Sequence, residues 1–254
     1  MKAARRIATT WLLLWFSVAF AYRNFPSAHQ LSHALLGIEP GHLFGFDTFG
    51  RDVLGTTLRA SFVSAAFALS VTLTSLFLAL SVGTPLAIAP AFTRFVGLRI
   101  LDTALAFPSL LFALAWAAIR GPGWGTLVFA LLIGIVPSIT RLVYLRARDV
   151  MKEDFVLAAR SLGAGDARIA VRHIMPAVFS LVLVKAPSLF AHALLAEATL
   201  TFLGIGAPIG HDSWGSLLAQ GKDYLIESPH IAFGAGLPLI LTVLSLQLLS
   251  ETDT

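Results

Sequence analysis

Long stretches without a charged residue limit this chain more than any other feature. No Asp, Glu, Lys or Arg occurs in three intervals: Arg59 to Arg94, Arg120 to Arg141, and Glu227 to Glu251. Each interval provides the ~20 apolar residues that a helix needs to cross a ~30 Å hydrocarbon core. Of the 254 residues, 57% are hydrophobic and only 13% are charged, which is too few charges for the surface of a soluble domain. The sequence therefore predicts a membrane protein.

Six apolar runs predict six transmembrane helices and an all-α fold. The runs are apolar on every side and longer than the ~10-residue alternating strands of a membrane barrel, so helices are expected. Two of the runs are short and cross only if flanking arginines snorkel to the interface. The predicted spans are Ile7–Tyr22, Phe62–Val82, Thr103–Ile119, Thr126–Tyr144, Ala177–Ala198 and His230–Leu249.

The distribution of Lys and Arg predicts the orientation of these spans. With the N-terminus inside, twelve of the 18 basic residues fall in cytoplasmic segments and five in outer segments, with Lys185 inside a span. The positive-inside rule then gives an N-in, C-in topology. The same distribution explains the net charge of +4 without a nucleic-acid surface. The absence of cysteine excludes disulfides and thiolate metal sites.

The first apolar run has two interpretations. Lys2, Arg5 and Arg6, followed by an apolar stretch and the small residues around Ala19 and Ala21, imitate a signal peptide. Cleavage there would leave five spans, so a retained anchor helix is the favoured interpretation.

The cytoplasmic segment between the fourth and fifth spans is too long for a simple connection. Neighbouring helices need only a few linking residues, and this segment uses about thirty. Its pattern predicts a helix over Val150–Leu162, a turn at Gly163 and Gly165, and a second helix through Ala167–His173 capped by Asp166. An amphipathic helix–turn–helix of this kind is better suited to docking a partner than to linking two spans.

Three motifs carry a resemblance to a known family. Ala158-Ala159, Gly163 and Pro176 resemble the EAA loop of ABC importer permeases, and FVLAARSLGAGDARIAVRHIMP is similar to the peptide and nickel branch. HLFGFDTFGRDVL (42–54) and EATLTFLGIG followed by SWG (197–206, 213–215) resemble outer motifs of that branch. Leu157 departs from the wider pattern, which has Glu there. The chain most resembles the C-type subunit of dipeptide and oligopeptide importers.

The resemblance implies the type I importer permease fold, divided into 1–60 (anchor helix and periplasmic segment) and 61–250 (five-helix core with a coupling loop, 146–176). It implies a bacterial inner-membrane permease for peptides, or for nickel or other small solutes, that pairs with a second permease subunit, two cytoplasmic ATPases and an extracytoplasmic solute-binding protein. ATP and Mg²⁺ would be used by the ATPases, with no cofactor and no catalytic residue on this chain. The coupling-loop residues are Ala158, Ala159, Arg160, Gly163, Ala164, Asp166, Arg168 and Pro176. The periplasmic-motif residues are Asp47, Gly50, Arg51 and Asp52.

Each of the remaining candidates has a structural alternative. Lys185 could meet a substrate carboxylate on the translocation path, but snorkelling or a structural pair is favoured. Glu197 is expected to tie the fifth span to the last outer loop, with Arg51 as the suggested partner. The outer Gly50-Arg51 turn could contact the binding protein or form an internal salt bridge, and the internal turn is favoured.

Other classes of protein fit less well. A proton-coupled secondary transporter using Lys185 and Glu197 would need more spans or inverted repeats. An intramembrane hydrolase lacks HExxH and GxSxG signatures. GSLLAQGKD (215–223) fails as a phosphate-binding loop because its glycine spacing is wrong and Asp223 replaces the Ser or Thr. The scattered histidines predict no bound metal.

Overall fold

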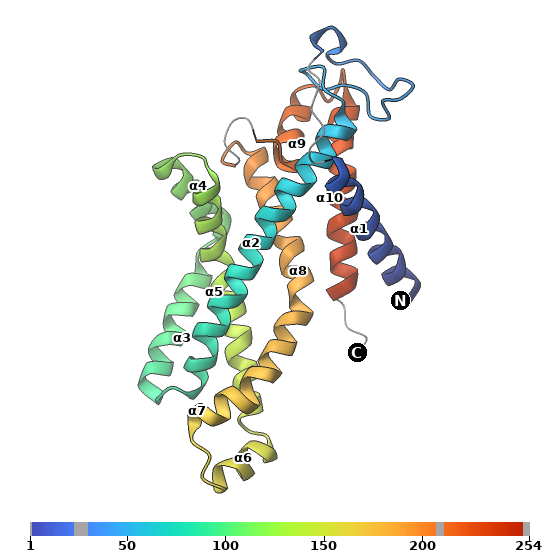
Figure 1. Ribbon diagram of the computed structural model, residues 1–254. Coiled ribbons are helices and arrows are strands. Elements are labelled where there is room, and N and C mark those ends of the chain that lie inside the picture. The colour runs from blue at the N-terminus through green and yellow to red at the C-terminus, as the bar shows by residue number, and fades with distance from the viewer. Residues whose placement is uncertain (1, 23–29, 207–210, 251–254) are drawn as a thin grey trace. The chain divides into compact units, whose positions relative to one another are not determined.

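The computed structural model describes residues 2–22, 30–206 and 211–250, and these residues are almost wholly helical (Figure 1). Within them no strand forms, and pairing is limited to two isolated β-bridges, Glu39 with His42 and Phe46 with Asp52. The helices are α1 (Lys2–Tyr22), η1 (Leu31–His33), α2 (Val53–Ile88), α3 (Ala91–Ala106), α4 (Ser109–Arg120), α5 (Trp124–Val150), α6 (Asp154–Ser161), α7 (Asp166–Ile169), the π-helical η2 (Ala170–Ile174), α8 (Met175–Phe202), α9 (Trp214–Asp223) and α10 (Pro229–Ser250).

Four helical stretches of the described chain are long and apolar enough to cross a membrane, and five if a bent pair counts as one span. They are Val53–Ile88, Trp124–Val150, Asp166–Phe202 and Pro229–Ser250, with Ala91–Ala106 plus Ser109–Arg120 as the bent pair. These match five of the six predicted spans. The predicted first crossing forms helix α1, which is not among these stretches although it is 21 residues long. Arg5 and Arg6 in its first turns lower its mean hydropathy.

The predicted third span differs most from the structure. Instead of one helix over Thr103–Ile119, the chain forms α3 and α4, which are bent by 80° at the break between them. The break falls at Phe107 and Pro108. A proline clashes with helical backbone at the residue before it, and Phe107 accordingly adopts an extended conformation (φ −85°, ψ 129°).

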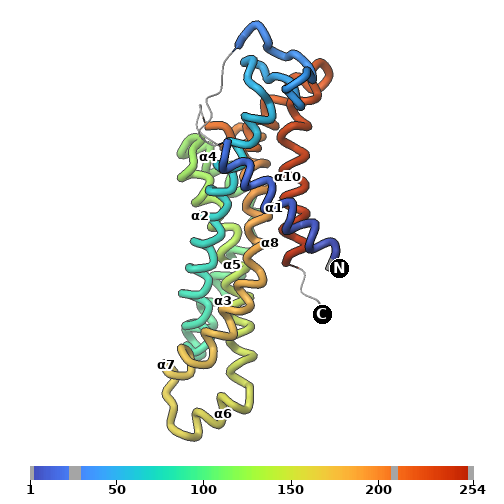
Figure 2. Tube along the Cα trace, turned by 45° about the vertical axis from the view of Figure 1, so that its right-hand side comes forward, coloured from blue at the N-terminus to red at the C-terminus, as the bar shows by residue number. Residues whose placement is uncertain are grey.

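The chain divides into two compact units that interleave along the sequence. The first unit comprises Met1–Ser70, Trp116–Leu127 and Pro187–Thr254. In it α1 and α10 lie side by side, as Figures 1 and 2 both show. The indole nitrogen of Trp11 donates to Thr242 Oγ1 of α10 at 3.3 Å, and Trp11 stacks on Trp15 with ring centroids 5.2 Å apart. Buried apolar side chains, including Leu58, form the core.

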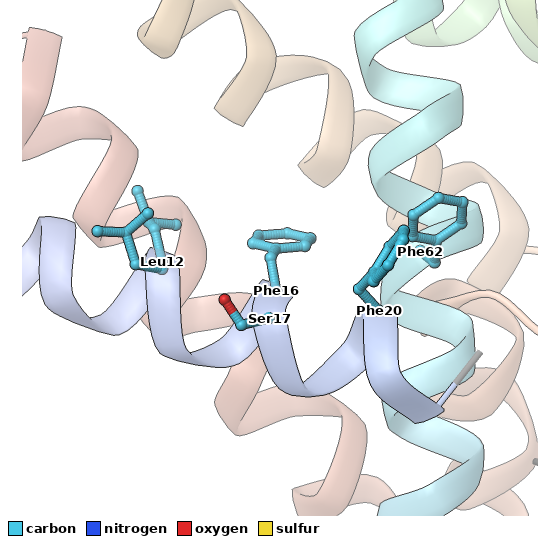
Figure 3. A pocket seen from close by; sticks show the side chains of 6 residues that line it. Leu12, Phe16, Ser17, Phe20 and Phe62 are labelled. Carbon is cyan, nitrogen blue, oxygen red and sulfur yellow. The ribbon is translucent and has the colours of Figure 1, made fainter.

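An apolar groove lies between α1 and α2 of this unit (Figure 3). Its volume is about 620 Å³, and Leu12, Phe16, Phe20 and Phe62 line it, with Ser17 as the hydroxyl-bearing residue. The rings of Phe20 and Phe62 lie 6.4 Å apart. A groove of this size that is lined by aromatic and leucine side chains suits contact with hydrocarbon.

The second unit comprises Val71–Ala115 and Val128–Ala186. Its core is formed by buried aliphatic side chains from α2, α5, α6, α7 and α8. Arg141 of α5 forms an ion pair with Asp102 of α3. At one end of this unit the chain leaves α5, passes through α6 and α7, and enters α8 (Figure 1).

Candidate functional site

The outer motif folds as a tight turn organised by one carboxylate. Asp47 is 1% exposed, and its Oδ1 accepts hydrogen bonds from the backbone N–H groups of Phe49 (2.8 Å) and Arg51 (2.9 Å). Its Oδ2 accepts from Arg51 Nε at 2.7 Å. Gly50 occupies the left-handed region with φ +68°, which a glycine adopts without steric penalty. The structure therefore forms the internal salt-bridged turn.

Asp52 begins α2. Its Oδ1 accepts from Gly55 N at 2.7 Å, which satisfies one of the backbone donors left free at a helix start. Its Oδ2 lies 2.5 Å from His42 Nδ1, and the His42 ring packs against Phe46 with centroids 4.4 Å apart. Asp52, the acidic residue of the Gly-Arg-Asp sequence, therefore caps α2. Its position directly before an apolar run favours this function.

Arg51 links two distant segments of the chain. Its Nη1 donates to Asp212 Oδ2 at 2.9 Å, across 161 residues of sequence. The suggested tie between Arg51 and Glu197 is wrong, because Arg51 pairs with Asp47 and Asp212 while the Glu197 carboxylate accepts from Ser64 and Thr201. Asp212 was not among the predicted site residues, since nothing in its local sequence indicates the partner.

Glu197 lies instead in a buried hydroxyl pocket. It is 0% exposed, and its carboxylate accepts from Ser64 Oγ of α2 (3.1 Å) and from Thr201 Oγ1 one turn later (2.9 Å). Ser64 Oγ in turn accepts from the backbone N–H of Trp214 at the start of α9 (3.1 Å). Glu197 therefore does join the fifth span to the outer loop, but through Ser64 and Trp214. The i,i+4 spacing of Glu197 and Thr201 can be found in the sequence, whereas nothing in the sequence indicates Ser64 as a partner of Glu197.

The cytoplasmic segment forms helix, turn and helix as predicted, with shorter helices. The first helix begins at Asp154 rather than Val150, because residues 151–153 form a turn. It ends in a Schellman motif: Gly163 has φ +86°, its N–H donates to Arg160 O (3.0 Å), and Ala164 N–H donates to Ala159 O (3.0 Å).

The second helix starts one residue earlier than expected. Gly165 is the N-cap residue, and Asp166 is the first helical residue rather than the cap, so that prediction is wrong. Asp166 Oδ1 instead accepts from Arg160 Nη2 at 2.9 Å, which joins the two helices across the turn. The helix then passes through the π-helical segment η2 into α8, whose second residue is Pro176.

The surface of this loop carries both apolar and charged side chains. Val156, Ile169 and Ile174 are buried and anchor the loop to its own unit. The predicted loop residues are accessible: Ala159 and Ala164 are half-buried, and Ala158, Arg160, Gly163, Asp166, Arg168 and Pro176 are exposed. Four large apolar side chains are also exposed, namely Phe155, Leu157, Leu162 and Val171. Leu162, at the turn, is 90% exposed.

The remaining charged candidate in the fifth span is Lys185, which is exposed on α8. The residues described by the structure include no group of three or more His, Asp or Glu side chains placed to hold a metal ion.

Comparison with known proteins gives one family. Residues 75–251 match the family described as binding-protein-dependent transport system inner membrane components. A protein named as a peptide transport system permease in Brucella suis is 38% identical over 210 residues, covering 83% of this chain and 71% of the relative. The glutathione transport system permease GsiD of Escherichia coli is 31% identical over 214 residues, covering 83% and 69%.

The methionine ABC transporter MetNI, in an inward-facing conformation, contains a chain of similar fold. The TM-score is 0.56 at 15% identity, and the match covers 75% of this chain and 93% of the other. At this identity the likeness establishes the fold, which is that of the type I importer permeases.

Proposed function

Because the chain belongs to the family of binding-protein-dependent transport system inner membrane components, it is the multi-pass permease subunit of an ATP-driven importer, and we propose that it carries peptides or peptide-like solutes. Two relatives support the solute class, since one is named for peptides and the other for the tripeptide glutathione. A proton-coupled secondary transporter is not favoured, because the relatives are named as permeases of peptide and glutathione transport systems.

The loop of residues 146–176 is the proposed contact with a cytoplasmic ATPase. Its Schellman turn and the Arg160–Asp166 pair fix two short helices relative to each other, and its buried aliphatic residues attach it to the core. A loop held in this way moves as a body, so a displacement of the ATPase would be passed to α8. Its exposed apolar side chains offer the area that a docked surface buries.

The proposed complex contains a second, homologous permease subunit, two ATPases and an extracytoplasmic solute-binding protein, in a bacterial inner membrane. ATP and Mg²⁺ would bind to the ATPases, and this chain would contribute no catalytic residue. ATP binding would bring the docked loops together and favour the outward-facing state, and hydrolysis would return the inward-facing state.

Leu162 provides a clean test of the docking proposal. Its side chain is almost fully exposed, so Leu162→Asp removes no internal packing and should leave the fold intact. Ile226, in the loop between α9 and α10, is 98% exposed and serves as the matched control, Ile226→Asp. We expect Leu162→Asp to lose ATPase co-purification and ATP-dependent peptide uptake when the whole importer is expressed.

The control variant should retain the ATPase. Retention of ATPase and uptake by Leu162→Asp would refute the docking role. Equal losses of ATPase co-purification and uptake in Leu162→Asp and Ile226→Asp would show that an exposed charge harms the complex wherever it is placed.

A further inference from the structure

His192 is an exposed ionisable side chain in an apolar helix. It lies in the second half of α8, between the buried residues Ala191 and Ala193. Glu197, the other acid–base group of this half, is buried and accepts from the hydroxyls of Ser64 and Thr201. A polar group that faces hydrocarbon without a partner is costly, so such groups in membrane helices face protein or water.

His192 is part of a polar row on the first unit's portion of α8. Ser188 lies one turn before it and Thr199 two turns after it, both accessible. At about 100° per residue the three side chains fall within about 40° of one another, and they span roughly 16 Å of the helix axis. Thr199 satisfies its own hydroxyl by donating to Leu195 O at 2.8 Å.

Gln247 of α10 extends the row to a second helix. Ser188 Oγ donates to Gln247 Oε1 at 3.2 Å, and both residues belong to the first unit. Because the amide oxygen is engaged by Ser188, the amide nitrogen of the exposed Gln247 remains available as a donor. The imidazole of His192, one helical turn from Ser188 along α8, supplies a second donor.

Two donors, one hydrogen-bonded to Ser188 through its amide and one a helical turn along α8 from it, match a ligand that has acceptors. We infer that His192 and Gln247, oriented by Ser188, line the solute path of this permease and bind the carboxylate of the passing solute. The inference rests on the proposed importer function and narrows its solute to carboxylate-bearing molecules, of which a peptide with a free C-terminus is one.

The absence of cysteine from the chain allows a labelling test that needs no identified solute. In the assembled importer, His192→Cys would be exposed to a membrane-impermeant trimethylammonium methanethiosulfonate reagent. The matched control is Leu241→Cys on α10, which runs antiparallel to α8 (Figure 1). Leu241 is an exposed apolar residue six positions before Gln247, and His192 is four after Ser188, so the two lie within about 3 Å of the same depth.

We expect His192→Cys to react at least about tenfold faster than Leu241→Cys, and a transported peptide to slow the reaction. Equal rates, or no reaction at His192→Cys, would overturn the inference. Loss of the second permease subunit from His192→Leu preparations would also overturn it, because His192 would then be a subunit contact.

Uptake tests the ligand class. With the dipeptide Ala-Ala as the probe, His192→Leu should lower ATP-dependent uptake about tenfold, the loss expected for a hydrogen bond to a charged group. His192→Gln, which keeps a donor, should recover most of it. Uptake of the C-terminal amide of the same dipeptide should change little, and an equal loss for both probes would refute carboxylate binding. A wild-type importer that carries neither probe would refute carriage of small dipeptides, while labelling would still decide whether His192 lines the path.

Discussion

Removal of the Glu197 side chain should destabilise the outer end of the first unit. Glu197→Ala deletes an acceptor that serves Ser64 of α2 and Thr201 of α8 at the same time. Ser64 also accepts from Trp214 N–H, so the same change loosens the start of α9. Because Glu197 is 0% exposed, water cannot replace the lost bonds without entering the core.

The size of the effect follows from the contacts. Two hydrogen bonds contribute about 0.5–1.5 kcal/mol each in proteins generally, with an average near 0.6 kcal/mol between membrane helices. One buried methylene adds about 0.8 kcal/mol. Glu197→Ala should therefore lower the free energy of unfolding by about 2–3 kcal/mol.

Glu197→Gln is the matched control because it keeps the shape and one acceptor. Its carbonyl oxygen can accept from Ser64, while the Thr201 hydroxyl rotates to accept from the new amide group. We expect a loss below about 1 kcal/mol for this variant. The measurement is equilibrium unfolding in mixed detergent micelles, followed by far-ultraviolet circular dichroism. A Glu197→Ala protein as stable as the wild type, or equal losses in both variants, would refute the reasoning.

Two further predictions concern the outer turn and the inner loop. Gly50→Ala should be strongly destabilising, because φ is +68° and the added Cβ would lie 1.9 Å from a backbone carbonyl oxygen. Gly163→Ala, with φ +86° but open space around the Cβ, should lower the free energy of unfolding by only about 1–2 kcal/mol. Equal changes in the unfolding free energy of the two variants would contradict this prediction. Arg51→Met should lower the unfolding free energy by about 3–5 kcal/mol, because it leaves a buried carboxylate unpaired. Asp212→Asn should lower the free energy of unfolding by less than about 1 kcal/mol, since that side chain is 26% exposed and keeps an acceptor. A larger loss for Asp212→Asn than for Arg51→Met would refute this prediction.

Patterns that repeat within one element were sufficient to predict much of this molecule. Uninterrupted apolar runs predicted the long helices, because a segment with no charge over about twenty residues has few stable alternatives to a membrane helix. The glycines at 163 and 165, next to an amphipathic stretch, predicted the helix–turn–helix of the cytoplasmic loop. The break between α3 and α4 was also predictable in principle, since Pro108 disfavours helix at Phe107.

The tertiary structure decided which distant residues meet. Arg51 had several acidic residues within the sequence as candidate partners, and only the folded chain places Asp212 beside it rather than Glu197. Ser64, Ser188 and Gln247 are ordinary polar residues of apolar helices, and their pairing depends on the register between helices. Helical periodicity fixes which residues share a face of one helix, but packing between helices fixes the rotation and depth at which two faces touch. The sequence by itself therefore determined most of the long helices and the family resemblance, and the packed helices determined the polar contacts.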